Sequence, residues 1–111
     1  MKIAIPLYDG RLCAHFGHCR QFALVQIDEA NKVRIVELAE PPEHAPGVLP
    51  AWLSERGAGV VIAGGMGRRA QGLFEAAGIR VVTGAPALPP KELAEQYMAG
   101  TLATGENVCD H

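Results

Sequence analysis

The sequence predicts an α/β protein, a single three-layer domain in which helices cover a mixed five-stranded sheet. The length of 111 residues leaves room for one hydrophobic core and no second one. Hydrophobic residues make up 49% of the chain and charged residues 20%, as in ordinary globular domains. The apolar pattern first alternates with a period of two and later switches between short apolar runs and helical spacing.

Strands dominate the first third of the chain. Residues 2–6 alternate between apolar and other side chains, and residues 21–27 form a mostly apolar run. Residues 33–38 alternate again after a polar turn at 28–32, so 21–38 is predicted to be a β-hairpin with a five-residue loop.

The remainder alternates helices with strands. A proline-rich loop at 41–46 is followed by a helix that begins near Val48 and ends at Gly57. Residues 59–63 are continuously apolar, which is typical of a strand buried on both faces of a parallel sheet. A helix over 70–77, a strand over 79–82 and a helix from Pro90 to Gly100 follow. The predicted order is β-β-β-α-β-α-β-α, with parallel crossovers in the second half.

Charge and hydropathy exclude several classes of function. The net charge of −2 argues against duplex nucleic acid as a partner, because phosphate neutralisation needs a basic face. No apolar run approaches the roughly 20 residues of a membrane span, and the N-terminus lacks the features of a signal peptide. We therefore expect a cytoplasmic protein. Three cysteines in that compartment favour metal binding over a disulfide framework.

The densest chemical feature lies in the loop between the first two predicted strands. Cys13, His15, His18 and Cys19 place four candidate ligands within seven residues. Thiolate and imidazole together suit zinc, copper or iron–sulfur species. All four are not expected on one ion, because the adjacent His18 and Cys19 side chains point apart. The alternative is two buried cysteines acting as small hydrophobes and two solvated histidines.

A second feature follows the buried strand and opens a helix. Gly64, Gly65 and Gly67 allow backbone N–H groups to turn inward, and Arg68 and Arg69 stand beside the positive end of the helix. These residues form a candidate anion cradle. The alternative is a tight strand-to-helix turn that needs glycine only for steric reasons.

The C-terminal residues 106–111 form a tail outside the predicted domain of residues 1–105. Cys109 and His111 in this tail are candidate additional ligands. The sequence offers few candidate groups for acid–base catalysis, because Asp9 is the one carboxylate close to the Cys/His loop. We therefore expect a protein that is not an enzyme. An enzyme for a small anionic substrate, with Cys19 as nucleophile, stays as an alternative.

The chain resembles the dinitrogenase iron–molybdenum cofactor biosynthesis family over nearly its whole length. The residues that carry the resemblance are Met1–Pro6, Asp9–Gly10, His15–His18, Gly64–Gly67 and Arg69–Ala70. The resemblance implies a ribonuclease-H-like fold and a role related to nitrogen fixation. It implies His15 as a cluster ligand and matches Cys19 to a cysteine of the nitrogenase branch. Cys13 and His18 add ligand character beyond the usual pattern, and Arg68 stands where many relatives have proline.

The predicted function is a non-enzymatic carrier of an iron–sulfur-based metallocluster, of the iron–molybdenum cofactor or precursor type. Its site would combine the loop 13–19 with the turn 64–69. The expected partners are the cluster and a protein that donates or accepts it, without nucleic acid or membrane. The chain itself is expected to be a monomer or a weak homodimer. The alternative function is a mononuclear zinc or copper binding module with a storage or regulatory role.

Overall fold

The computed structural model describes residues 1–14, 16, 19–42 and 47–105. Within these ranges the chain forms six strands and three helices. In chain order they are β1 (Lys2–Tyr8), β2 (Arg11–Leu12), β3 (Gln21–Ile27), β4 (Val33–Ala39), α1 (Val48–Glu55), β5 (Val60–Ile62), α2 (Arg68–Ala76), β6 (Arg80–Val82) and α3 (Pro90–Ala99).

The strands form one mixed sheet in the order β4-β3-β1-β5-β6. The central strand β1 is antiparallel to β3 and parallel to β5. β3 and β4 form an antiparallel hairpin whose loop spans residues 28–32, as the sequence predicts. β5 and β6 are parallel, which confirms a sheet that is antiparallel in one half and parallel in the other.

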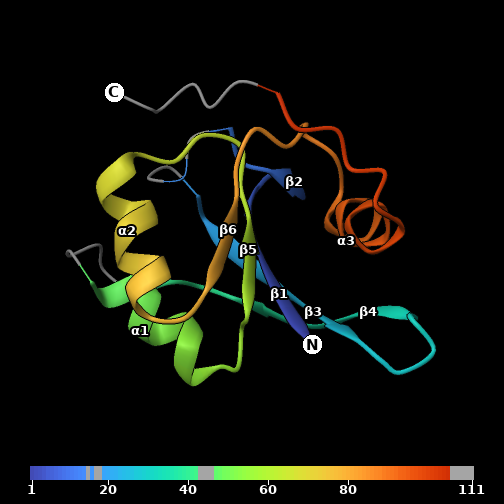
Figure 1. The fold of residues 1–111 in the computed structure, drawn as a ribbon, viewed down its shortest axis with the longest axis horizontal. Coiled ribbons are helices and arrows are strands. Elements are labelled where there is room, and N and C mark those ends of the chain that lie inside the picture. The colour runs from blue at the N-terminus through green and yellow to red at the C-terminus, as the bar shows by residue number, and fades with distance from the viewer. Residues whose placement is uncertain (15, 17–18, 43–46, 106–111) are drawn as a thin grey trace.

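Three layers result from the alternation of side chains along β1. Ile3 and Ile5 belong to one buried cluster and Ala4 to the other. The cluster with Ala4 includes side chains of α1 and α2, whereas the cluster with Ile3 and Ile5 includes side chains of α3. Figure 1 accordingly shows α1 and α2 on one side of the sheet and α3 on the other. Val60, Val61 and Ile62 of β5 are all buried, as expected for a strand covered on both faces.

The prediction of five strands misses β2. Tyr8 of β1 pairs with Arg11 of β2, so Asp9 and Gly10 form a two-residue hairpin turn. Both turn residues have positive φ, 56° for Asp9 and 81° for Gly10, which is the requirement of the type I′ turn that Asp-Gly favours. The hairpin turns the chain back before it enters the Cys/His loop.

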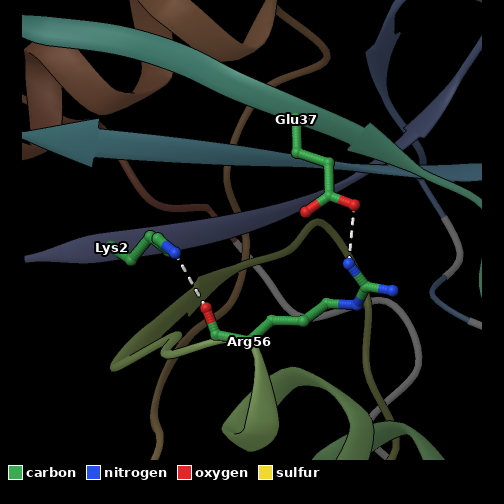
Figure 2. A network of polar contacts seen from close by, with 3 residues as sticks. All are labelled: Lys2, Glu37 and Arg56. Atoms are coloured by element: carbon green, nitrogen blue, oxygen red, sulfur yellow. Dashed lines mark hydrogen bonds and ion pairs between the residues drawn. The ribbon is translucent and has the colours of Figure 1, made fainter.

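The end of α1 is fastened to two strands of the sheet. Lys2 Nζ donates a hydrogen bond of 3.0 Å to the Arg56 carbonyl, and Arg56 Nη1 lies 2.6 Å from Glu37 Oε2 (Figure 2). The Arg56 guanidinium also lies 4.6 Å from the ring centroid of Trp52. One residue therefore connects α1 to both β1 and β4. Among the described residues, no helix has the length and apolar character needed to cross a membrane.

Candidate functional site

The motif at 13–19 follows the β1–β2 hairpin, and the motif at 64–69 follows β5, the parallel neighbour of β1. Because these strands run in the same direction, the segments after them leave the same edge of the sheet. The chain continues from β1 through β2 towards β3 on one side, and from β5 through α2 towards β6 on the other. Open α/β sheets bind ligands at such points, where the connections diverge.

Backbone hydrogen bonds join the two motifs directly. The Gly65 N–H donates to the Ala14 carbonyl at 2.8 Å, and the Phe16 N–H donates to the Gly65 carbonyl at 3.0 Å. The loop after β2 and the glycine turn after β5 are therefore one structural unit. The sequence pattern predicts each motif, and the structure brings them together.

Glycine at position 64 is needed for this contact. A Cβ atom there would lie 3.0 Å from the Ala14 carbonyl oxygen and 3.2 Å from the Cys13 carbonyl oxygen. Both neighbours are backbone atoms, which cannot rotate away as a side chain can. The alternative of a turn that needs glycine for steric reasons therefore holds at Gly64. The Gly65 N–H is already used in the bond to Ala14, so the cradle role depends on the start of α2.

The helix α2 points its N-terminus to this edge. Gly67 is its N-cap residue and, being glycine, provides no side-chain cap for the first N–H groups. The first turn carries Arg68 and Arg69, both exposed. The Gln71 side chain donates to the Met66 carbonyl at 2.8 Å, which fixes the entry into the helix. The helix dipole and the two cationic side chains both favour an anion here.

The two described cysteines of the loop are buried. Cys13 is 5% exposed and Cys19 is 7% exposed, and both belong to the apolar cluster that contains Phe16, Phe22 and Phe74. Neither forms a disulfide. Burial and the nearby Cys13 raise the pKa of the Cys19 thiol from 9.0 to about 12. This part of the loop matches the alternative of cysteines acting as small hydrophobes, and it opposes a reactive Cys19 thiolate.

Several predicted ligands lie outside the described residues. They are His15, His18, Cys109 and His111. Within the described ranges, no three His, Cys, Asp or Glu side chains gather as a metal site would require. The ligand set of Cys13, His15, His18 and Cys19 therefore stays a prediction.

Tyr8 and Arg20 also border the site, although no sequence motif points to them. Tyr8 and Asp9 separate two open depressions, one lined by Cys19 and Arg20 and the other by Cys13. The Arg20 guanidinium lies 5.4 Å from the centroid of the Tyr8 ring, which is half exposed. The signal that could have identified them is position, since Tyr8 ends β1 and Arg20 precedes β3.

The charge of the described residues fits an anionic iron–sulfur-type cluster, but the position of Cys19 does not. The N-terminal end of α2, with its dipole and with Arg68 and Arg69, provides positive charge for an anionic cluster. The buried, protonated Cys19 is not arranged as an exposed ligand. Cysteine ligation would require both proton loss and movement of the loop.

Comparison with known proteins gives the family. Residues 1–100 match the family model described as dinitrogenase iron-molybdenum cofactor. The chain belongs to this family. An uncharacterized protein of Methanocaldococcus jannaschii is 35% identical over 85 residues, which cover 73% of this chain and 72% of that protein. The resemblance stated from the motifs is thereby confirmed.

Solved structures agree with the family assignment. The crystal structure of PH0822 matches with a TM-score of 0.85 and 34% identity, over 96% of this chain and 98% of the other. The apo form of the orange protein from Desulfovibrio gigas matches with a TM-score of 0.73 and 23% identity, over 96% and 93% of the two chains. The second similarity shows the fold alone. Together they confirm the α/β fold, which in the described residues comprises one mixed sheet and three helices.

Proposed function

We propose that the protein is a non-enzymatic carrier of an iron–sulfur-based metallocluster, of the iron–molybdenum cofactor or precursor type. The family assignment supports a cofactor-related role. The observation that carries the proposal for this chain is the pair of hydrogen bonds between Gly65 and the loop at Ala14 and Phe16. They combine the candidate ligands of one motif with the anion cradle of the other.

Each part of the site has a distinct role in the proposal. His15 coordinates exposed iron, and the glycine turn and α2 N-terminus stabilise the negative charge of the cluster. Arg68 and Arg69 add charge-assisted donors to sulfide or to attached anionic groups. A carrier benefits from few ligands, because it must release its cargo to an acceptor protein. A buried Cys19 agrees with such a weak attachment and joins only when the loop opens.

Cluster uptake by anaerobically purified apo protein tests the proposal. We expect iron and sulfide to bind stoichiometrically after incubation with a cluster donor, with charge-transfer bands in the visible spectrum. His15→Ala should lose most of this uptake. His44→Ala is the matched control, because it removes a histidine from the proline-rich loop instead. Equal uptake by wild type and His15→Ala would reject the proposed ligand, and no uptake by wild type would reject the carrier.

A mononuclear zinc or copper module is the second candidate. Cys13 and Cys19 belong to the same buried cluster, which favours this candidate because one ion can use two thiolates of a single cluster. This function predicts one Zn(II) or Cu(I) per chain, retained against a weak chelator and lost in Cys13→Ala or Cys19→Ala. The same elemental analysis separates the candidates, since a mononuclear site contains no acid-labile sulfide.

An enzyme with Cys19 as nucleophile is not favoured. A thiol pKa of about 12 leaves very little thiolate at neutral pH. Alkylation of folded protein at pH 8, followed by peptide mass spectrometry, tests this directly. Slow modification of Cys19 agrees with a carrier, whereas modification faster than that of a free thiol would support the enzyme hypothesis.

The proposal also includes the fold, the cellular location, a protein partner and the C-terminal tail. The strand order supports the ribonuclease-H-like fold that the family resemblance implies. The proposed setting is the cytoplasm, with a protein donor or acceptor of the cluster. Cys109 and His111 are proposed as additional ligands. Deleting residues 106–111 tests them, because unchanged metal retention would reject their role.

A further inference from the structure

The strand β4 forms a long edge of the sheet. It lies at one end of the strand order and pairs on one side with β3. It has seven residues, whereas β6 at the opposite edge has three. Ile35, Val36 and Leu38 are 40%, 44% and 55% exposed, so this edge presents apolar side chains together with its backbone groups. An exposed apolar edge strand is a template for pairing with another strand.

A β-bulge at Val36 places Arg34 and Glu37 on the same face of β4. Val33, Ile35 and Leu38 lie opposite Ile27, Val25 and Ala23, which share one face of β3. Arg34 and Glu37 lie opposite Gln26 and Leu24, which share the other face. Without the bulge at Val36, positions 34 and 37 would point to opposite faces. One face of β4 is therefore apolar and the other carries both charges.

The charges along the edge are ordered by sign. Lys32 and Arg34 occupy the first half of the segment, and Glu37 and Glu40 occupy the second. Antiparallel pairing of two copies sets each positive half against a negative half. Parallel pairing would set like charges side by side. The edge is therefore complementary to itself in one orientation.

We propose that two copies of the chain pair through β4, antiparallel, about a two-fold axis perpendicular to the sheet. With this axis, the apolar face of β4 in one copy continues into the apolar face of β4 in the other, and the two charged faces likewise form one surface. In the register that aligns the charges, Arg34 lies opposite Glu37 of the second copy, and Val33 lies opposite Leu38. The ion pair with Arg56 already holds Glu37 on the charged face, as Figure 2 shows.

The interface is small, and the dimer is accordingly weak. Pairing of seven residues falls at the low end of specific interfaces, where association is transient. The result is one continuous sheet built from two copies. This inference does not depend on the proposed cargo, because β4 lies at the opposite side of β3 from the strands that carry the candidate site.

Sedimentation equilibrium of the full chain at low salt, over micromolar to millimolar concentrations, tests the dimer. Wild type should show a monomer–dimer equilibrium that weakens as salt is added. Arg34→Glu places two acidic side chains on the charged face of each copy, and should weaken dimerisation about tenfold or more. Arg80→Glu on β6 is the matched control, because it makes the same charge change at the other edge, and it should leave the equilibrium unchanged.

Mixing complementary variants distinguishes a lost interface from a lost fold, because variants that fail to fold would not regain dimerisation on mixing. The double variant Glu37→Arg with Arg56→Glu reverses the intrachain ion pair and leaves two basic side chains on the face. At the concentration where wild type is half dimeric, each variant alone should be mostly monomeric, and an equimolar mixture should form heterodimers detectable by native mass spectrometry. A wild-type monomer at every concentration would overturn the proposal. So would an Arg34→Glu variant that dimerises as strongly as wild type, or a mixture that forms no more dimer than either variant alone.

Discussion

The backbone of Gly64 lies against the backbone of Ala14, so closely that a Cβ atom on Gly64 would be 3.0 Å from the Ala14 carbonyl oxygen. This contact connects segments that are far apart in the sequence. It is also next to the hydrogen bond by which Gly65 donates to the same carbonyl. The geometry of the candidate site therefore depends on the absence of one side chain.

Gly64→Ala should separate the two halves of the site. The added methyl group meets backbone atoms, and overpacking of this kind costs about 1–3 kcal/mol. We expect a lower free energy of unfolding in urea and weaker cluster uptake. Gly72→Ala is the matched control, because a Cβ atom there meets nothing within 4 Å in the exposed face of α2. That control should be stabilised by about 0.5–1 kcal/mol. Equal stabilities of the two variants would contradict the close contact.

Gly84→Ala should detach the segment that ends at Gly105. The Gly105 N–H donates to the Gly84 carbonyl at 2.6 Å, and a Cβ atom on Gly84 would collide with the Gly105 backbone. Gly78→Ala is the control, since its φ of 81° resembles the 78° of Gly84 but nothing lies within 4 Å. Both variants bear the left-handed penalty of about 1–2 kcal/mol. Only Gly84→Ala should speed hydrogen exchange of the Gly105 amide, measured by NMR.

Stability should fall in alkaline solution because of Cys19. Its pKa is about 12 in the folded protein, above the 9.0 of an ordinary thiol, because burial favours the neutral form. Between these values the folded state holds the proton more tightly than the unfolded state, so the free energy of unfolding decreases as the pH rises from about 9 towards 12. Urea unfolding at pH 8, 9 and 10 measures the slope. Cys19→Ala should show a shallower decline, and an identical decline would contradict the assignment.

Arg56 should matter more for stability than Glu37. Arg56→Ala removes both the ion pair with Glu37 and the packing over Trp52, whereas Glu37→Ala removes the ion pair alone. We expect a loss of about 1 kcal/mol for Arg56→Ala and about half of that for Glu37→Ala. Thermal unfolding of the two variants and their double mutant measures the coupling. Added salt should reduce only the ion-pair contribution.

Much of the fold could be predicted from local patterns. The hairpin over 21–38, the buried strand at 59–63 and the three helices each have their own apolar period, and all are present. The strand β2 was missed because two residues carry no period. The Asp9–Gly10 pair was the available signal for it, since this dipeptide favours a two-residue hairpin.

The candidate site was less accessible to sequence reasoning. The motifs at 13–19 and 64–69 were found from ligand chemistry and glycine spacing. Their hydrogen bonding through Ala14 and Gly65 depends on strand pairing far along the chain, which no local pattern encodes. The burial of Cys13 and Cys19 was weighed only as an alternative, because a cysteine has the same chemistry as a core residue and as a ligand until its surroundings are known. The tail boundary at residue 105 and the ligand roles of His15 and His18 stay predictions.

The division of the sheet into two halves sets the order in which the molecule can assemble. β3 and β4 are joined by a short turn, so their contacts close a small loop and form at little entropic cost. The pairing of β1 with β5 brings Ile3 beside Val60, and this contact must wait for closure of a much longer loop. The candidate site joins the segments that follow β1 and β5, so we expect it to be completed late in folding. A chain that has formed only its antiparallel half lacks the hydrogen bonds between Gly65 and the loop at Ala14 and Phe16, so a ligand that needs both motifs has its site only after the core has closed.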